Sequence, residues 1–245
     1  MKKIFCLFVL SAWFWAARIT PLQAASSYSI VLDWSANTYS PLSYTAKAKT
    51  MPINGSTLTV YANIFSVAKT QTTFQYQKLE PAQYTFTWYV NDKKLESGAG
   101  QDIFRYTIPR GIFTNQVSIK LEAANETSII GNKTLTIPVL SEPEVRIFRE
   151  QNNKLIPLVI TNVTGAKQTI VKLIPLPYFF NVSSPIQLSF LWYEGKKRLP
   201  SNSYTGGVFE IKLPDYAASD SFKSVIYNNS FDLELGQQDI EITSK

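Results

Sequence analysis

The chain has 245 residues, of which 45% are hydrophobic and 17% are charged, and its formal net charge is +6. This apolar content is enough to bury a core, so the composition excludes a disordered chain. The sequence contains no histidine and a single cysteine, Cys6. These counts exclude Ser-His-Asp and Cys-His catalysis, zinc sites with His or Cys ligands, and haem held by histidine.

Residues 1–24 have the pattern of a secretory signal peptide. Lys2 and Lys3 precede an apolar run from Ile4 to Ala17, and a small-residue cleavage site ends at Ala24. The run is shorter than the roughly 20 residues that span a bilayer, although an uncleaved anchor remains the alternative. Cleavage would remove three of the 24 basic residues and leave an excess of +3 over the 18 acidic ones. We therefore expect an extracytoplasmic mature chain that has no membrane span and does not bind nucleic acid.

Alternation of apolar and polar residues recurs along the first half of the chain and predicts β-strands. In 84–90, Phe86, Trp88 and Val90 share one face, which we expect to be buried. The stretch 66–82 is rich in Gln and Thr, so it is expected to form a long loop or an edge excursion. Strands are predicted at 28–34, 56–62, 84–90, 103–108, 116–123 and 127–137.

The second half of the chain repeats the first. The stretch Thr85-Phe-Thr-Trp-Tyr-Val-Asn-Asp-Lys-Lys-Leu95 returns as Ser189-Phe-Leu-Trp-Tyr-Glu-Gly-Lys-Lys-Arg-Leu199. The spacing is 104 residues for the pairs Trp88/Trp192 and Leu95/Leu199. It is 105 for Pro109/Pro214, Val117/Phe222, Gly131/Gly236, Leu135/Ile240 and Ile137/Ile242. One inserted residue explains the change, so we predict two tandem copies of one fold, with Trp88, Leu95, Trp192 and Leu199 as core markers.

The repeat also predicts the domain boundaries. The first copy ends near Ile137 and the second begins near Glu144, so the expected domains are 25–141 and 142–245. The linker 138–143 has a proline at each end and is expected to be extended and stiff. We therefore expect the two domains to abut with limited freedom.

A mid-strand Trp, then a turn of Asn, Asp or Gly with Lys, then Leu, resembles bacterial immunoglobulin-like and PKD-like modules. The resemblance covers residues 28–242. It implies an all-β protein made of two tandem antiparallel β-sandwich domains, with each Trp in the core of its sandwich. A Lys-Lys signal followed by a body without cysteine also looks bacterial. The whole arrangement resembles exported proteins of small-genome bacteria, some of them associated with type IV pilus or surface-assembly systems.

Two basic turns are the first candidate partner surface. Lys93 and Lys94 lie in the first copy, and Lys196, Lys197 and Arg198 lie in the second. These cations either contact an anionic surface polymer or form solvated turns that block edge pairing.

The apolar segment 173–180 is the second candidate. Tyr178, Phe179 and Phe180 either anchor a partner or pack within or between the domains. Pro175 and Pro177 make the segment a poor central strand. The acidic pairs at 232/234 and 239/241 are expected to lie on outward strand faces, without the further ligands that calcium needs.

We therefore predict an exported, non-catalytic structural or interaction protein without a cofactor or metal. Its partner would be an extracytoplasmic protein or surface polymer in a cell-surface or pilus-associated assembly. One alternative is a carbohydrate-binding module that uses Tyr39, Tyr44 or Tyr204. Another is a periplasmic chaperone-like protein, which needs an exposed edge strand and basic residues in the cleft between its domains.

Overall fold

A computed structural model of the chain describes residues 27–41, 49–69, 72–111, 114–158, 162–201 and 204–245. The predicted signal peptide, with Cys6, and Tyr44 lie outside these residues. Strands joined by turns make up most of the described chain, with two short 3-10 helices, Pro81–Gln83 and Pro185–Gln187. The predicted all-β fold is therefore confirmed. None of the described helices is long and apolar enough to cross a membrane.

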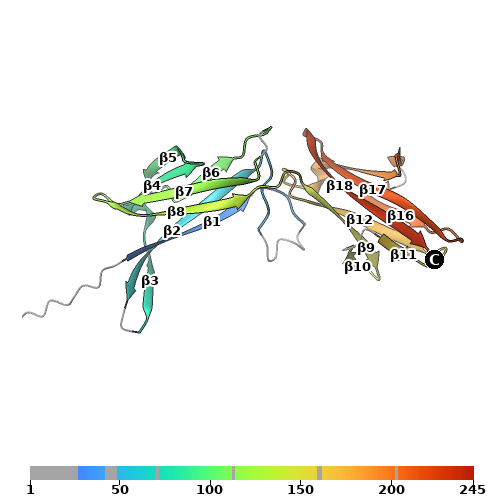
Figure 1. Ribbon diagram of the computed structural model, residues 1–245, viewed down its shortest axis with the longest axis horizontal. Helices are drawn as coiled ribbons and strands as arrows, with labels where there is room; N and C mark the ends of the chain where they lie inside the picture. The colour runs from blue at the N-terminus through green and yellow to red at the C-terminus, as the bar shows by residue number, and fades with distance from the viewer. Residues whose placement is uncertain (1–26, 42–48, 70–71, 112–113, 159–161, 202–203) are drawn as a thin grey trace, which may run out of the picture.

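The strands of the first half form two antiparallel four-stranded sheets (Figure 1). One has the order β1-β2-β3, with β6 also paired to β2, and the other has the order β5-β4-β7-β8. The strands are β1 (Ser27–Ala36), β2 (Thr57–Lys69), β3 (Phe74–Lys78), β4 (Thr85–Val90), β5 (Lys93–Ala99), β6 (Ile103–Thr107), β7 (Gln116–Ala124) and β8 (Ile129–Pro138).

The second half forms two five-stranded sheets, ordered β10-β9-β12-β16-β15 and β11-β18-β17-β13-β14. Their pairs are antiparallel except for β11 with β18, which is parallel. The strands are β9 (Glu144–Gln151), β10 (Lys154–Pro157), β11 (Asn162–Gly165), β12 (Ile170–Tyr178), β13 (Leu188–Glu194), β14 (Lys197–Arg198), β15 (Tyr204–Thr205), β16 (Val208–Lys212), β17 (Ala218–Asn228) and β18 (Phe231–Ser244).

The first half has its own hydrophobic core, built around Trp88. The alternation along β4 buries Phe86, Trp88 and Val90. Trp88 is fully buried, its ring stacks on Phe104 with centroids 5.2 Å apart, and its indole N–H donates to the carbonyl of Gln101 at 2.9 Å. A buried indole N–H without a partner would lower the stability of the fold, and here the backbone supplies a partner.

The second half has a separate core with the same arrangement around Trp192. Trp192 is fully buried, its ring lies against Phe209 with centroids 5.0 Å apart, and its N–H donates to the carbonyl of Gly207 at 2.8 Å. Phe104 and Phe209 are 105 residues apart, the spacing found in the sequence repeat. The two tryptophans therefore occupy corresponding positions in the two halves.

The assignment of Leu95 as a core marker is wrong, because its side chain is 45% exposed. The pairing of β4 with β5 shifts between Trp88 and Tyr89, which pair with Glu96 and Lys94 and leave Leu95 as an extra residue. Such a bulge re-aims the side chain. Leu199 differs, since it is half-buried against the second core and its N–H donates to the carbonyl of Trp192 at 2.8 Å.

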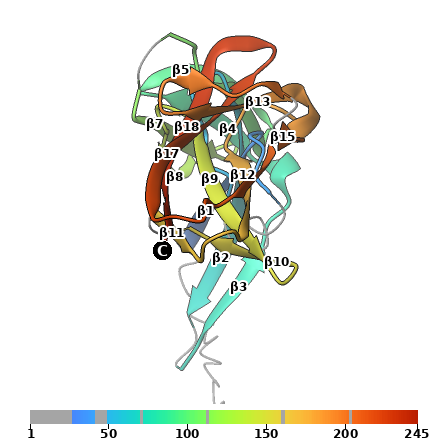
Figure 2. The ribbon, with the colours of Figure 1, turned by 90° about the vertical axis from the view of Figure 1, so that its right-hand side faces the viewer.

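The stretch 66–82 is not a long loop. β2 continues to Lys69 and β3 pairs with it, which gives a hairpin that projects from the body of the protein (Figures 1 and 2). This agrees with the alternative of an edge excursion. All five side chains of β3 are exposed, so no buried face was available to give the sequence a strand pattern.

The prolines of segment 173–180 were expected to make it a poor central strand, and the part of the segment that carries them pairs with described strands on one side only. β12 lies between β9 and β16. However, β16 pairs with β12 only from Ile170 to Leu173, whereas β9 continues to Tyr178. Beyond Leu173 one edge of β12 therefore has no partner among the described strands, so Pro175 and Pro177 can lack an N–H there without breaking a described ladder.

Candidate interaction surfaces

Of the two alternatives for Tyr178, Phe179 and Phe180, the structure supports packing and not an exposed partner surface, because the three side chains are buried, with 3%, 2% and 0% exposure. Phe179 has a φ of +66°, a left-handed conformation that is rare for a bulky residue. This turn directs neighbouring rings into different clusters. Phe179 packs with Ile53 of the first half, whereas Phe180 packs in a cluster of the second half against which Tyr39 lies.

Backbone hydrogen bonds join the two halves at this junction. The N–H of Tyr39 donates to the carbonyl of Phe180 at 2.7 Å, and the N–H of Phe179 donates to the carbonyl of Tyr39 at 2.6 Å. The side-chain amide of Asn181 donates to the carbonyl of Asn54 at 3.1 Å. The left-handed turn is thus held by partners from the other half, and a strained conformation persists only under such constraint.

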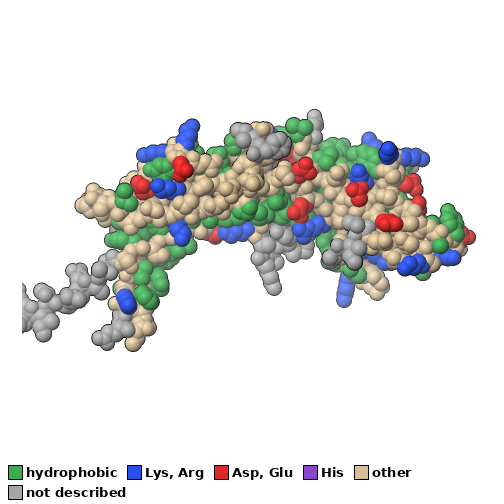
Figure 3. All heavy atoms as spheres, in the orientation of Figure 1, with side chains coloured by type: hydrophobic (Ala, Val, Ile, Leu, Met, Phe, Trp, Pro, Cys, Tyr) green, Lys and Arg blue, Asp and Glu red, His purple; other side chains and the backbone are tan. Residues whose placement is uncertain are grey.

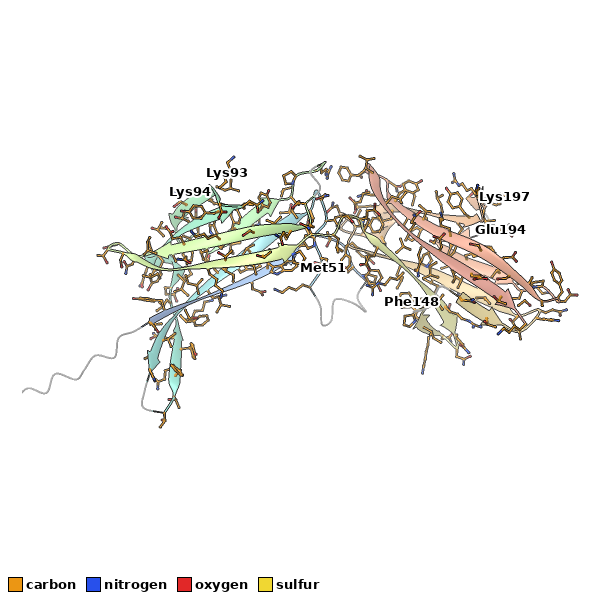
Figure 4. The ribbon with its side chains drawn as sticks, viewed as in Figure 1. Met51, Lys93, Lys94, Phe148, Glu194 and Lys197 are labelled. Carbon is orange, nitrogen blue, oxygen red and sulfur yellow. The ribbon has the colours of Figure 1, made fainter. Side chains whose placement is uncertain are left out.

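The linker takes part in the same junction. The N–H of Leu140 donates to the carbonyl of Pro52 at 2.9 Å, and Leu140 forms a parallel bridge with Ile53. Met51 and Phe148 pack against the apolar cluster around Ile53 and are labelled in Figure 4. Because Tyr39 is half-buried in this contact, it is not an exposed ring for a sugar to stack on. The side chain of Tyr204 lies outside the described residues.

A groove of about 410 Å³ opens beside the junction. Its lining includes Ile53, Arg110, Pro143, Phe231 and Glu234. The guanidinium of Arg110 lies over the Phe231 ring, 3.5 Å from its centroid, so a cation of the first half contacts the second half. The chaperone-like alternative requires basic residues in the cleft between the domains, and Arg110 in this groove is a basic residue.

Glu234 in the groove does not lie on an outward face, as the sequence pattern led us to expect, since it is only 9% exposed. Burial raises the pKa of its carboxyl above 4.5. The opposing influences are smaller. They are the hydrogen bond that its carboxylate accepts from the backbone N–H of Asn181, bonds from the Asn228 and Asn181 side chains, and the charge of Arg110.

Both basic turns are exposed. Asn91 and Asp92 have φ values of +46° and +65°, which suits a tight hairpin turn, and they place Lys93 and Lys94 at the start of β5. In the second half the turn carries Lys196, with Lys197 and Arg198 on β14. Lys93, Lys94 and Lys197 point to the same side of the molecule (Figure 4), where Lys and Arg side chains gather above both halves (Figure 3).

Sequence reasoning missed an exposed apolar surface on the outward side of the β1-β2-β3 sheet. Tyr61 is opposite Asp33 and Ile103, and Tyr76 is opposite Val67. Residues directly opposite one another in a sheet share a face, and every second residue along β2 faces outward. The surface, which we call the outer aromatic face, comprises Val31, Tyr61, Phe74, Tyr76 and Ile103, all 40–65% exposed. The sequence signal for this surface was the presence of apolar residues, such as Phe65 and Val67, at the odd-numbered positions of β2, which face outward.

Within the described part of the chain, no group of three or more Asp, Glu, His or Cys side chains is placed to hold a metal ion. The side chain of Asp232 lies outside the described part of the structure. Asp239 lies 3.7 Å from Lys223, and Glu241 accepts a hydrogen bond from the hydroxyl of Ser219.

No protein-family model matches the chain, and no curated protein matches it. Among solved structures, it is similar to the fibronectin(III)-like modules of Clostridium thermocellum CbhA, with 12% identity over 89% of this chain and 94% of that one and a TM-score of 0.28. It is similar to the N-terminal Ig1-2 module of Drosophila Receptor Protein Tyrosine Phosphatase DLAR, with 12% identity over 89% and 99% of the two chains and a TM-score of 0.28. Murine CEACAM1b has 12% identity over 88% and 100% of the chains and a TM-score of 0.26.

Proposed function

We propose that this chain is an exported, non-catalytic structural or interaction protein of a bacterial cell-surface or pilus-associated assembly. Its two domains, 25–141 and 142–245, act as one stiff unit that presents turns, strand edges and exposed faces to an extracytoplasmic partner. The observation that carries this proposal is the junction between the two halves. There Phe179 and Phe180 are buried, and their backbones form hydrogen bonds with the backbone of Tyr39.

The junction supports a scaffold because its contacts restrict rotation between the halves. Covalently linked domains move relative to each other unless their interface is large and apolar. Here Ile53 and Phe179, from opposite halves, are 2% exposed, and Arg110 lies across the groove on Phe231. A stiff unit loses less conformational freedom when it joins an assembly, so rigidity favours binding.

Export is tested with the full chain expressed in a bacterium and followed by cell fractionation. We expect a cleaved product that begins near residue 25 and is reached by a protease added to spheroplasts or intact cells. A deletion of residues 1–24 should remain inside and uncleaved. A full-length chain found in the cytoplasm would contradict the proposal.

The partner surface of this proposal includes the two basic turns. Cations at both halves face one side, and such a surface suits an anionic polymer. The test replaces Lys93, Lys94, Lys196, Lys197 and Arg198 with Ala and measures binding to an anionic polysaccharide at two salt concentrations. We expect weaker binding and a smaller salt dependence. A control replaces five exposed lysines elsewhere, Lys133, Lys154, Lys167, Lys212 and Lys245, with Ala. It should bind more tightly than the turn variant. Equal loss of binding in the two variants would show that net charge, and not the turns, determines binding.

One observation favours carbohydrate recognition as a second function. Tyr61 and Tyr76 on the outer aromatic face are 40% and 65% exposed, and exposed rings on a sheet can stack on sugar rings. The test is a pull-down with insoluble neutral polysaccharides, comparing the wild type with Tyr61→Ala. Retention of the wild type alone would support this function, and no retention of either chain would exclude it for the polymers used.

A further inference from the structure

We propose that β3 is a self-association edge, on which a second copy of this chain pairs its own β3 in antiparallel orientation. The two β1-β2-β3 sheets would then join into one sheet across a two-fold axis. This inference goes beyond the proposed function and does not depend on it, because it concerns only the projecting hairpin.

The outer edge of β3 is open. Among the described strands, β3 pairs only with β2, and its five side chains are all exposed. The N–H of Leu79 donates to the carbonyl of Ile64 in β2 at 2.9 Å. Because N–H and C=O groups alternate in direction along a strand, those of Phe74, Tyr76 and Lys78 point away from β2. Three residues thus present backbone donors and acceptors to solvent.

Four other edges in the described chain carry a proline, a bulge or an all-basic short strand, whereas the one protective side chain of β3 is Lys78 at its end. β10 contains Lys154 and Pro157, β14 has only Lys197 and Arg198, and the pairings of β5 and β8 are interrupted by bulges. Charge, proline, bulges and shortness are the usual protections of an exposed edge. β3 has no proline and pairs with β2 in an unbroken register.

The sequence of β3, Phe-Gln-Tyr-Gln-Lys, is complementary to itself when two copies run antiparallel about Tyr76. In that register Tyr76 faces its own copy, each Phe74 faces a Lys78, and each Gln75 faces a Gln77. The pairs are aromatic with aromatic, cation with ring, and amide with amide, all of which are favourable across strands. No two lysines are opposite one another. The outward-pointing N–H and C=O groups of Phe74, Tyr76 and Lys78 in one copy also lie opposite those of the other copy, as antiparallel hydrogen bonding requires.

The placement of the hairpin leaves room for a second copy. It projects from the body of the protein in both ribbon views (Figures 1 and 2). An edge of five residues buries less than the roughly 1,200 Å² of a stable interface. The dimer should therefore be weak and dependent on concentration, with a partner assembly raising its population by local concentration.

The test is sedimentation velocity on residues 25–245 over a wide concentration range. We expect the weight-average mass to rise towards that of a dimer. Tyr76→Pro, which removes an outward N–H, and Phe74→Lys, which places lysine opposite Lys78, should both stay monomeric. Phe74→Lys combined with Lys78→Glu should restore the dimer, because each new lysine then faces a glutamate.

Melting temperatures close to the wild type establish that the variants are folded, since all three positions are exposed. A wild-type chain that stays monomeric at every concentration would overturn the proposal. So would a dimer that persists in Tyr76→Pro and Phe74→Lys, because another surface would then hold it. A double variant that remains monomeric would overturn the proposed register.

Discussion

The backbone N–H of Tyr39 donates to the carbonyl of Phe180 at 2.7 Å, which joins a connecting segment of the first half to the residues that follow β12 in the second. Phe180 is fully buried, and Tyr39 packs against its cluster. A single pair of residues thus combines a hydrogen bond and an apolar contact across the junction. The same pair explains why neither residue is available to a ligand.

Replacing Phe180 with Ala should destabilise the protein by about 3–5 kcal/mol, because it leaves a cavity in a buried cluster. The measurement is chemical denaturation followed by fluorescence. Phe74→Ala is the matched control, since Phe74 is 59% exposed and its removal should change the free energy of unfolding by less than about 0.5 kcal/mol. Equal effects of the two substitutions would argue against a packed junction.

Trp88→Ala and Trp192→Ala should each cost about 3–5 kcal/mol, because both rings are fully buried. Trp88→Phe should cost less, since it keeps an aromatic ring and loses the N–H donated to Gln101. Because the two cores are separate, hydrogen exchange should show the larger loss of protection in the half that carries the substitution. Full retention of stability in either Ala variant would mean that its ring is not a core residue.

The two leucines of the repeat should behave differently. Leu95→Ala should leave the free energy of unfolding within about 0.5 kcal/mol of the wild type, because Leu95 lies exposed at a bulge. Leu199→Ala should destabilise by about 1–2 kcal/mol, less than a fully buried leucine, because Leu199 is half-buried against the second core. Thermal melts of both variants provide the comparison, and a larger loss for Leu95→Ala would contradict it.

Glu234 should make stability depend on pH. Its pKa in the folded protein is raised above the ordinary value of 4.5, so folding favours the protonated form. The stabilisation is fully present below about pH 4.5 and is lost as the pH rises through the folded pKa. Glu234→Gln stays neutral, so its melting temperature relative to the wild type should rise between about pH 4 and about pH 7.

The matched control for this prediction is Glu126→Gln, at an exposed position in the turn before β8. Its melting temperature should follow that of the wild type across the same pH range. A difference between Glu234→Gln and the wild type that stays constant or falls as the pH rises would show that burial does not dominate at Glu234.

The period-two pattern predicted most strands because those strands have one buried face. β4 and β7 are clear cases, where Trp88 and Leu121 are buried and their neighbours along the strand face outward. The repeat spacing also held for residues outside the original match, since Phe104 and Phe209 lie against the corresponding tryptophans. A strand with one buried face alternates apolar and polar residues, and this local pattern can be recognised in a single sequence.

The remaining features depend on contacts that a local pattern does not encode. β3 is stabilised by pairing with β2 and buries no face, so its Gln-rich sequence looked like a loop. The position of Leu95 depends on a bulge in the β4–β5 pairing. The junction depends on the left-handed turn at Phe179 and on Tyr39, which is distant in sequence. The conformation of β3, the exposure of Leu95 and the packing of the junction each depend on a partner strand or segment.

Small-angle scattering tests the central proposal, that the two domains form one stiff unit. The sample is residues 25–245 carrying Phe74→Lys, which keeps the chain monomeric if β3 pairs as proposed. We predict scattering that one elongated arrangement explains, with a narrow distribution of distances between the two halves. The same chain with Phe180→Ala should broaden that distribution. A broad distribution in the chain with an intact junction would contradict the proposal.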